Sequence, residues 1–296
     1  MPSLPGRRRI QAIFRVAGVA RIIGELEAKM GRSILAFVVL LSACVSLSAQ
    51  WLHYPTPGIP RTPDGKPNLS APAPKTPDGK PDLSGIWNIQ DNPGQTQFLD
   101  IAPSVQGGLP YRPGIAELTK ARSAPPKTSE PITRCLPIGI VERHTWIGGL
   151  KKIVQIPGLL LILNEYNTSF RQIFTDGRRL PTIDQTAWDG YSIGKWEGNT
   201  LVVETTGFRD GQWLDTAGDP LTDAAKITER FRRLDFGHME VEITIDDPKA
   251  YTKPWTFKVN QVLVPDTELL EFICLENEKD IQHMNAGAQK VGSEAK

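Results

Sequence analysis

The 296-residue sequence predicts an all-β protein, an antiparallel meander that closes into a barrel, with a β-sandwich as the alternative. From Lys151 onward, short segments alternate apolar and polar residues with the period of a β-strand, and turn residues separate them at short intervals. The most recognisable β-hairpin lies within this region, at Gln185–Phe208. Many successive antiparallel strands favour a barrel or a two-sheet sandwich, because closure removes aggregation-prone edges.

The hairpin is centred on Gly198-Asn199, which supplies the two positive-φ positions of a two-residue turn. Side chains alternate along a strand, so the register places small and apolar residues on one face. The expected cross-strand pairs on that face are Trp196 with Leu201, Gly194 with Val203, Ser192 with Thr205, and Gly190 with Gly207. This face therefore forms a furrow of small residues, and the opposite face carries Glu204.

Alternation and turn signals define the remaining elements. A first strand is expected to begin near Gly85, and a short helix is expected around 115–122 in an otherwise irregular segment, 91–137. A helical turn capped by Thr222 is expected at 221–227. The other expected strands are 152–156, 159–164, 169–174, 190–196, 200–206, 227–233, 239–245, 256–264 and 269–274.

The N-terminal region divides into three parts before the β-domain. Residues 30–49 combine a short basic start, the apolar core SILAFVVLL and a small-residue exit, which is typical of a secretory signal peptide. Residues 1–29 are then an upstream extension that suggests a misplaced start codon. A proline-rich arm follows at 50–82, then a single barrel domain at 83–283 and a flexible tail at 284–296.

The expected localisation is export to the periplasm or the extracellular space. An alternative is a lipoprotein, because Leu41-Ser42-Ala43-Cys44 resembles a bacterial lipobox, and the membrane would then be reached only through the leader or a lipid on Cys44. The first 49 residues hold seven of the 34 basic and two of the 33 acidic residues, which leaves 27 basic and 31 acidic residues. This mildly acidic remainder argues against nucleic acid as a partner.

The arm contains a tandem repeat, TPDGKPNLS at 62–70 and TPDGKPDLS at 76–84. Pro-Asp-Gly favours a turn in each copy. Two copies are too few for a solenoid, so a linker is the preferred interpretation and a binding role the alternative.

Beyond Cys44, only Cys135 and Cys274 are present. In an oxidising compartment, an isolated pair of this kind is expected to form a disulfide, and two buried thiols are the alternative.

Motifs for metal or cofactor binding are lacking, so neither a metal nor a cofactor is expected. His144 and His238 have no ligand spacing, and each is interpreted as a surface or hydrogen-bonded residue. Gly190-Tyr-Ser-Ile-Gly194 spells G-x-S-x-G, but Ser192 lies within a strand and not at a strand-to-helix turn, so it is not expected to be a nucleophile.

Carboxylates are the candidates for catalysis, and Glu204 with Glu229 is the pair considered for acid and base roles. Ion pairs with arginines such as Arg171 or Arg178 on neighbouring strands are the favoured alternative.

Gly85-Ile86-Trp87 at the start of a β-meander resembles the Gly-x-Trp start of lipocalin-like (calycin) barrels. The resemblance implies that Trp87 closes the barrel base against an arginine from the last strand. The last two expected strands contain Lys258 but no arginine.

A longer resemblance covers most of the chain after the leader. The segments TPDGKPDLSGIW, GYSIGKWEGNTLVVETTGF and TERFRRLDFGHMEVEITIDDPKAYTKPW look like the signature of a large uncharacterised family of exported bacterial proteins. This resemblance implies export and a shared fold, and it names no reaction.

The leading functional hypothesis is a non-catalytic, monomeric binding protein for a small apolar or sugar-like ligand. The expected ligand-binding residues come from the hairpin region and are Trp188, Gly190, Ser192, Gly194, Trp196 and Glu204. The alternatives are a hydrolase or isomerase that uses Glu204 and Glu229, and a cell-surface structural module.

Overall fold

The computed structural model describes residues 55–90, 101–125, 127, 130–145, 149–182 and 184–276. The leader, Cys44 and the tail at 284–296 lie outside these residues, so the predictions about them stay predictions.

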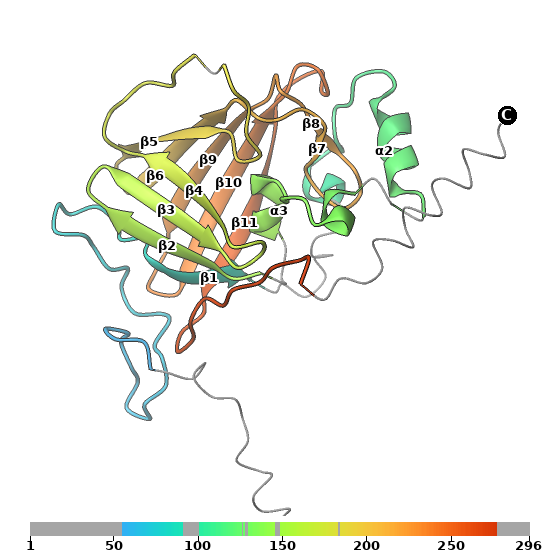
Figure 1. The fold of residues 1–296 in the computed structure, drawn as a ribbon. Coiled ribbons are helices and arrows are strands. Elements are labelled where there is room, and N and C mark those ends of the chain that lie inside the picture. The colour runs from blue at the N-terminus through green and yellow to red at the C-terminus, as the bar shows by residue number, and fades with distance from the viewer. Residues whose placement is uncertain are drawn as a thin grey trace, which may run out of the picture. The chain divides into compact units, whose positions relative to one another are not determined.

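Nine strands form a closed barrel in the order β1-β11-β10-β9-β6-β5-β4-β3-β2 (Figure 1). The all-β barrel that the sequence predicts is thereby confirmed, and the sandwich does not form. The barrel strands are β1 (Gly85–Ile89), β2 (Lys151–Ile156), β3 (Leu159–Asn164), β4 (Ser169–Phe174), β5 (Tyr191–Glu197), β6 (Thr200–Thr206), β9 (Lys226–Arg233), β10 (His238–Asp246) and β11 (Trp255–Leu263).

The remaining elements lie outside the wall of the barrel. Strands β7 (Gln212–Trp213) and β8 (Pro220–Leu221) form a small separate sheet. Helix α2 (Ile115–Ser123) matches the expected short helix, and α3 (Ile140–Thr145) was not expected. Two 3₁₀ turns are present at Ala102–Ser104 and Pro131–Arg134.

The register of the 185–208 hairpin is as the sequence predicts for the pairs Trp196 with Leu201, Gly194 with Val203, and Ser192 with Thr205. The barrel departs from a simple meander at one place, where β4 and β5 pair in parallel through Ile173 and Ser192. The chain therefore turns back between β4 and β5, and β5 begins beside the last residues of β4.

Two expected elements are wrong. Residues 269–274 form no strand, because β11 already pairs with both β10 and β1 and offers no free edge. Residues 221–227 form no helical turn: Leu221 ends β8, Lys226 begins β9, and residues 222–225 between them form a hydrogen-bonded turn, in which the Thr222 hydroxyl accepts from the backbone N–H of Ala224 at 3.2 Å.

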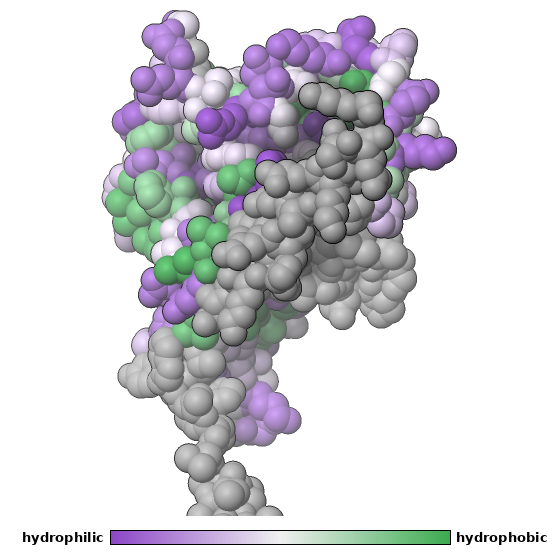
Figure 2. All heavy atoms as spheres, turned by 45° about the vertical axis from the view of Figure 1, so that its right-hand side comes forward, coloured by the Kyte–Doolittle hydropathy of each residue, from purple (hydrophilic) through white to green (hydrophobic). Residues whose placement is uncertain are grey.

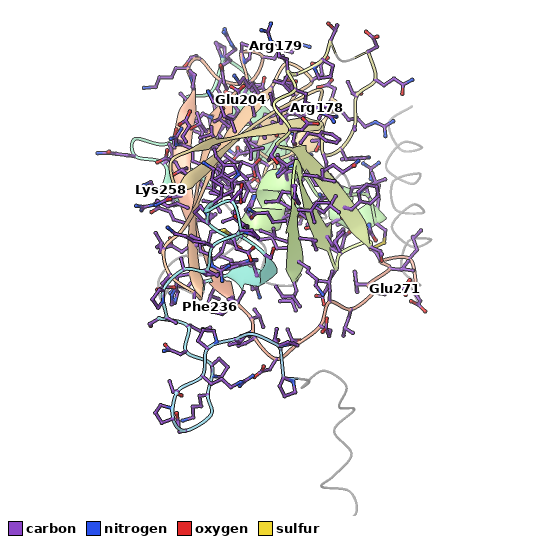
Figure 3. The ribbon with its side chains drawn as sticks, turned by 90° about the vertical axis from the view of Figure 1, so that its left-hand side faces the viewer. Arg178, Arg179, Glu204, Phe236, Lys258 and Glu271 are labelled. Carbon is purple, nitrogen blue, oxygen red and sulfur yellow. A yellow bond between two sulfur atoms is a disulfide. The ribbon has the colours of Figure 1, made fainter. Side chains whose placement is uncertain are left out.

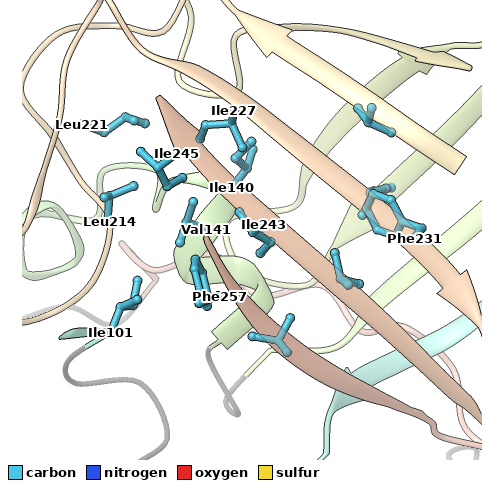
Figure 4. Packing of buried hydrophobic residues seen from close by; sticks show 14 of the residues in the cluster. Ile101, Ile140, Val141, Leu214, Leu221, Ile227, Phe231, Ile243, Ile245 and Phe257 are labelled. Carbon is cyan, nitrogen blue, oxygen red and sulfur yellow. The ribbon is translucent and has the colours of Figure 1, made fainter. Parts of the chain in front are cut away.

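Helix α3 fills one end of the barrel, which we call the helix end, where β9 and β11 begin. All six residues of α3 are buried. Ile140 and Val141 lie among Ile227, Ile243 and Phe257 from the barrel wall (Figure 4). The interior at this end is therefore packed with side chains.

The proline-rich arm lies at the opposite end, which we call the arm end. Both copies of the repeat form the same turn: Thr62 N–H donates to Lys66 O at 2.8 Å, and Thr76 N–H donates to Lys80 O at 2.9 Å. In each copy the threonine hydroxyl also bonds to the aspartate two residues later. The shared TPDGKP sequence thus forms the same turn at two places.

The disulfide between Cys135 and Cys274 is present, as expected. Asn167 holds both half-cystines, because its side chain donates to Cys135 O at 3.0 Å and accepts from Cys274 N–H at 3.1 Å. The bridge ties the segment after β11 to the segment before α3.

The described surface mixes polar and apolar residues, and green apolar patches stand among purple polar ones in Figure 2. Exposed large apolar side chains include Phe170 and Leu275, which are 62% and 61% exposed. Among the described helices, none has the length and apolar character needed to cross a membrane.

Candidate functional site

A buried polar cluster lies inside the barrel, centred on Glu229 of β9. Arg171 of β4 donates from Nη1 to Glu229 Oε1 at 3.0 Å and from Nη2 to Oε2. His144 of α3 lies with Nε2 at 2.8 Å from the same Oε1. The Glu229 carboxylate is fully buried, so this paired geometry offsets the large cost of removing its charge from water.

Ser192 and Thr205 complete the shell around Arg171. The Arg171 Nε donates to the Ser192 hydroxyl at 3.1 Å, and Nη2 donates to the Thr205 hydroxyl at 2.9 Å. The two hydroxyls lie 2.9 Å apart across the hairpin. Ser192 is thus fixed by an arginine and a threonine, in keeping with the expectation that it is not a nucleophile.

The charges within the cluster are set by burial and by neighbours. Burial alone would raise the pKa of Glu229, but the positive charge of Arg171 and the hydrogen bond from His144 outweigh it and hold the pKa at about 2. Burial, with the nearby charge of Lys151, lowers the pKa of His144 to about 4 despite its hydrogen bond to Glu229. We therefore assign a neutral His144 that donates from Nε2 to an ionised Glu229.

Lys151 of β2 is the other ionisable group inside the barrel. It is 3% exposed, and its Nζ donates to Arg143 O at 3.1 Å. Burial lowers its pKa to about 7, opposed by the negative charge of Glu229. A small, partly open cavity of about 10 Å³ lies beside it, lined in part by Arg143, His144 and Arg171.

An apolar cavity of about 300 Å³ opens at the arm end of the barrel. Its barrel wall comes from the β2–β3 hairpin, the residue after β4, and the β5–β6 hairpin. The second copy of the arm repeat forms the remaining side. The lining residues are Thr76, Pro77, Asp78, Gln155, Ile156, Pro157, Gly158, Leu160, Thr175, Trp196 and Leu201.

Gln155 fixes the arm beside this cavity. Its side chain accepts from Leu83 N–H at 2.9 Å and donates to Pro81 O at 3.2 Å. The hydrogen-bonding capacity of the Gln155 amide is therefore directed at the arm. The remaining barrel surface of the cavity is formed mainly by aliphatic and aromatic side chains, which suits an apolar ligand.

A second groove of about 310 Å³ lies between the arm and the base of the barrel. Charged groups line it, and they already have partners: Lys152 pairs with Glu268 at 3.3 Å, and Arg233 donates to backbone carbonyls. This groove is less enclosed than the apolar cavity.

The row of small residues on the hairpin does not face open space. A Cβ atom added at Gly190 would lie 2.5 Å from Thr206 O, and φ there is +57°. One added at Gly194 would lie 3.0 to 3.1 Å from Thr175, Ile173 and Leu201. The furrow that the sequence suggests as a ligand cavity is therefore occupied by neighbouring side chains and backbone.

Of the six expected ligand-binding residues, the structure brings Trp196 to the apolar cavity, with Gly194 directly behind its lining. Ser192 belongs to the Glu229 cluster. Trp188 stacks under Arg209, whose guanidinium carbon lies 5.8 Å from the ring centroid. Glu204 lies on the outer face of the wall, where it pairs with Lys226 (Figure 3).

Glu204 and Glu229 are not brought together. Glu204 lies opposite Thr228 in the β6–β9 ladder, and Glu229 lies opposite Val203. Because neighbouring positions on a strand face opposite sides of the sheet, one carboxylate points outward and the other inward. Glu204 and Glu229 therefore share no cavity in which they could act as an acid–base pair. Ion pairing to arginine, the alternative, is observed for Glu229 with Arg171.

A second group of buried acids lies at the helix end. Burial raises the pKa of Glu142 to about 8, and burial with the charge of Asp219 raises that of Asp215 to about 7. Tyr111 donates its hydroxyl to Asp219 at 2.5 Å. These groups line none of the three cavities described above, and their effect is on the pH dependence of stability.

Several of these residues could not be identified from the sequence. His144 was considered only as a surface or hydrogen-bonded residue, and it is the latter. Arg171 was considered only as an ion-pair partner, and Lys151 was not singled out. The signal for Arg171 and Lys151 is a charged residue at an inward position of a strand, which is visible only once the register is known.

Within the described residues, no cluster of three or more His, Cys, Asp or Glu side chains has the geometry of a metal site. A scan against models of known protein families finds no match, and a search of curated proteins also finds none.

Proposed function

We propose that this protein is an exported, non-catalytic binding protein for a small apolar ligand. The observation that carries the proposal is the cavity of about 300 Å³ at the arm end, lined by Trp196, Leu160 and Leu201. Its volume is at the lower end of the range for small-molecule pockets. The barrel around it is closed and supplies a rigid wall.

The chemistry of the lining favours an apolar ligand over a sugar. A sugar needs several convergent hydrogen-bond donors and acceptors, and the Gln155 amide is already engaged by the arm. Trp196 offers one aromatic face, and the other barrel side chains are mainly aliphatic. A compact hydrophobic molecule, or the apolar end of a longer one, fits this lining.

The buried Glu229 cluster does not support the alternative function, a hydrolase or isomerase. Glu229 is paired with Arg171 and His144, and the space beside Lys151 has a volume of only about 10 Å³. No substrate of ordinary size fits there.

Export is supported by two observations. The sequence at 30–49 has the pattern of a signal peptide, and Cys135 and Cys274 form a disulfide, which is typical of oxidising compartments. Mass spectrometry of the N-terminus of the protein recovered from its producing cells tests this part. A mature start after residue 49, or a lipid on Cys44, supports export, and retention of 30–49 contradicts it.

Binding is tested by titrating the purified protein with an environment-sensitive apolar dye and competing it with fatty acids, sterols and aromatic compounds. Thr175→Phe fills the cavity from its wall, so it is expected to weaken dye binding at least about tenfold. Thr256→Phe adds the same ring on the exposed face of β11 and serves as the matched control. Equal affinity in all three proteins would contradict the proposal.

A further inference from the structure

The small, partly open cavity beside Lys151 has an unusual lining for its size. Its volume is about 10 Å³, enough for a single water-sized particle. The lining residues are Ile140, Arg143, His144, Lys151, Ile162, Asn164 and Arg171. Three of them are cationic side chains, and none is a carboxylate.

The positive charge around this cavity is only partly balanced by the protein. Arg171 is balanced by Glu229, and Arg143 by Asp189 at 2.5 Å. Lys151 makes no ion pair within the described part of the chain, and one of its three N–H donors reaches a carbonyl, Arg143 O. Glu229 acts on it only through space, because that carboxylate is held by Arg171 and His144.

A second buried donor belongs to Arg143, which also lines this cavity. The Nε atom of Arg143 is fully buried and makes no hydrogen bond within the described residues. Arg143 and Lys151 are 8% and 3% exposed, so bulk water does not solvate them. Buried donors without partners are rare in folded proteins, because each one costs free energy, and a bound acceptor commonly explains them.

From this lining we propose that the cavity binds one compact monovalent anion of the halide class, held by Lys151 Nζ and Arg143. An anion here supplies the missing counter-charge for Lys151 and an acceptor for the free donors. Its small volume suits a compact anion better than phosphate, sulfate or a carboxylate, and Ile140, Ile162 and Asn164 complete the lining.

A water molecule is the competing occupant. His144 Nδ1 is a buried atom without a hydrogen-bond partner among the described residues, and as an acceptor in the neutral tautomer it suits water better than a halide. The two occupants differ in their response to salt. A bound anion stabilises the folded state more as its concentration rises, and by an amount that depends on which anion is present. A bound water molecule gives no such dependence.

The test compares thermal unfolding in sodium chloride and in sodium gluconate at equal ionic strength, at about pH 6, where Lys151 is protonated. Gluconate is too large for the cavity and controls for screening. We expect the Tm to be a few degrees higher in chloride. The increment should disappear in Lys151→Met, which replaces the ammonium by an apolar chain of similar length.

Lys152→Met is the matched control, because Lys152 is the next residue on β2, faces outward and pairs with Glu268. It is expected to keep the chloride increment. Equal Tm values in the two salts, or an increment that survives in Lys151→Met, would overturn the proposal.

Should Lys151→Met fail to fold, crystals of the unmodified protein soaked in bromide give an independent answer. An anomalous peak within hydrogen-bonding distance of Lys151 Nζ supports the anion. Its absence there assigns the cavity to water and overturns the proposal.

Discussion

Arg233 of β9 stacks on Trp87 of β1, with its guanidinium carbon 4.9 Å from the centroid of the indole ring. The same guanidinium donates to Asp82 O at 2.5 Å, to Asp235 O at 3.1 Å, and to Phe236 O. The Trp87 indole N–H donates to Leu83 O at 3.0 Å. An arginine therefore does close the base of the barrel over the tryptophan, but it comes from β9 and not from the last strand.

Replacing Arg233 by Met is expected to lower the free energy of unfolding by about 2–5 kcal/mol, because several partly buried carbonyls lose their donor and the ring loses its cation. Urea unfolding measures the change. Arg232→Met is the control, since Arg232 is exposed and pairs with Glu240 at 3.1 Å on the outer face. Similar losses in the two variants would contradict a closing role for Arg233.

Replacing Glu229 by Gln leaves Arg171 buried without a counter-charge, so we expect a loss of about 3–5 kcal/mol at neutral pH. Glu204→Gln breaks an exposed pair with Lys226 and is expected to cost at most about 1 kcal/mol. Denaturant unfolding of both variants tests the difference between the inner and outer carboxylates.

The same variant changes the response to acid. The folded-state pKa of Glu229, about 2, lies below its ordinary value of 4.5, so its contribution to stability is present above pH 4.5 and is lost as the pH falls toward 2. Unfolding measured across this window should be less pH-dependent in Glu229→Gln than in the unmodified protein. An unchanged profile would argue that Glu229 is not held ionised.

Gly194→Leu is expected to destabilise the barrel by about 1–3 kcal/mol or more, because even a Cβ at this position lies close to Ile173, Thr175 and Leu201. Lys195→Leu adds the same side chain one residue later, at an exposed position, and is the control. A Gly194→Leu protein as stable as the control would mean that open space lies behind the glycine.

Glu142 makes stability depend on pH in the opposite sense to Glu229. Its folded-state pKa of about 8 is raised above the ordinary 4.5, so its stabilising contribution is complete below pH 4.5 and is lost as the pH rises through 8. Glu142→Gln should therefore remove a fall in stability between pH 4.5 and 8. The exposed Glu117→Gln serves as the control, and a fall that persists in Glu142→Gln would contradict the assignment.

The fold was predictable where a local pattern decides it. Alternation defined the strands, and Gly198-Asn199 fixed the register of the hairpin. The segment 269–274 has a strand-like composition, but the barrel is already closed by the pairing of β11 with β1. No strand edge is left with which this segment could pair, so it forms no strand. Helix α3 has six residues, too few for a helical period to be recognised.

The site was less predictable, because it depends on which distant residues meet. Arg171, His144 and Glu229 are far apart in the sequence, and only the closed barrel brings them together. Arg233 was missed for the same reason, since the end of β9 reaches Trp87 only after closure. Trp196 was found because the hairpin register alone places it on the inner face.

The most direct test of the proposed function is a crystal structure of the protein with the apolar compound that competes best in the dye titration. We expect density for that compound between Thr76–Asp78 of the arm and Trp196, Leu160 and Leu201 of the barrel. Density at another place, with this cavity unoccupied while the compound is bound, would contradict the account.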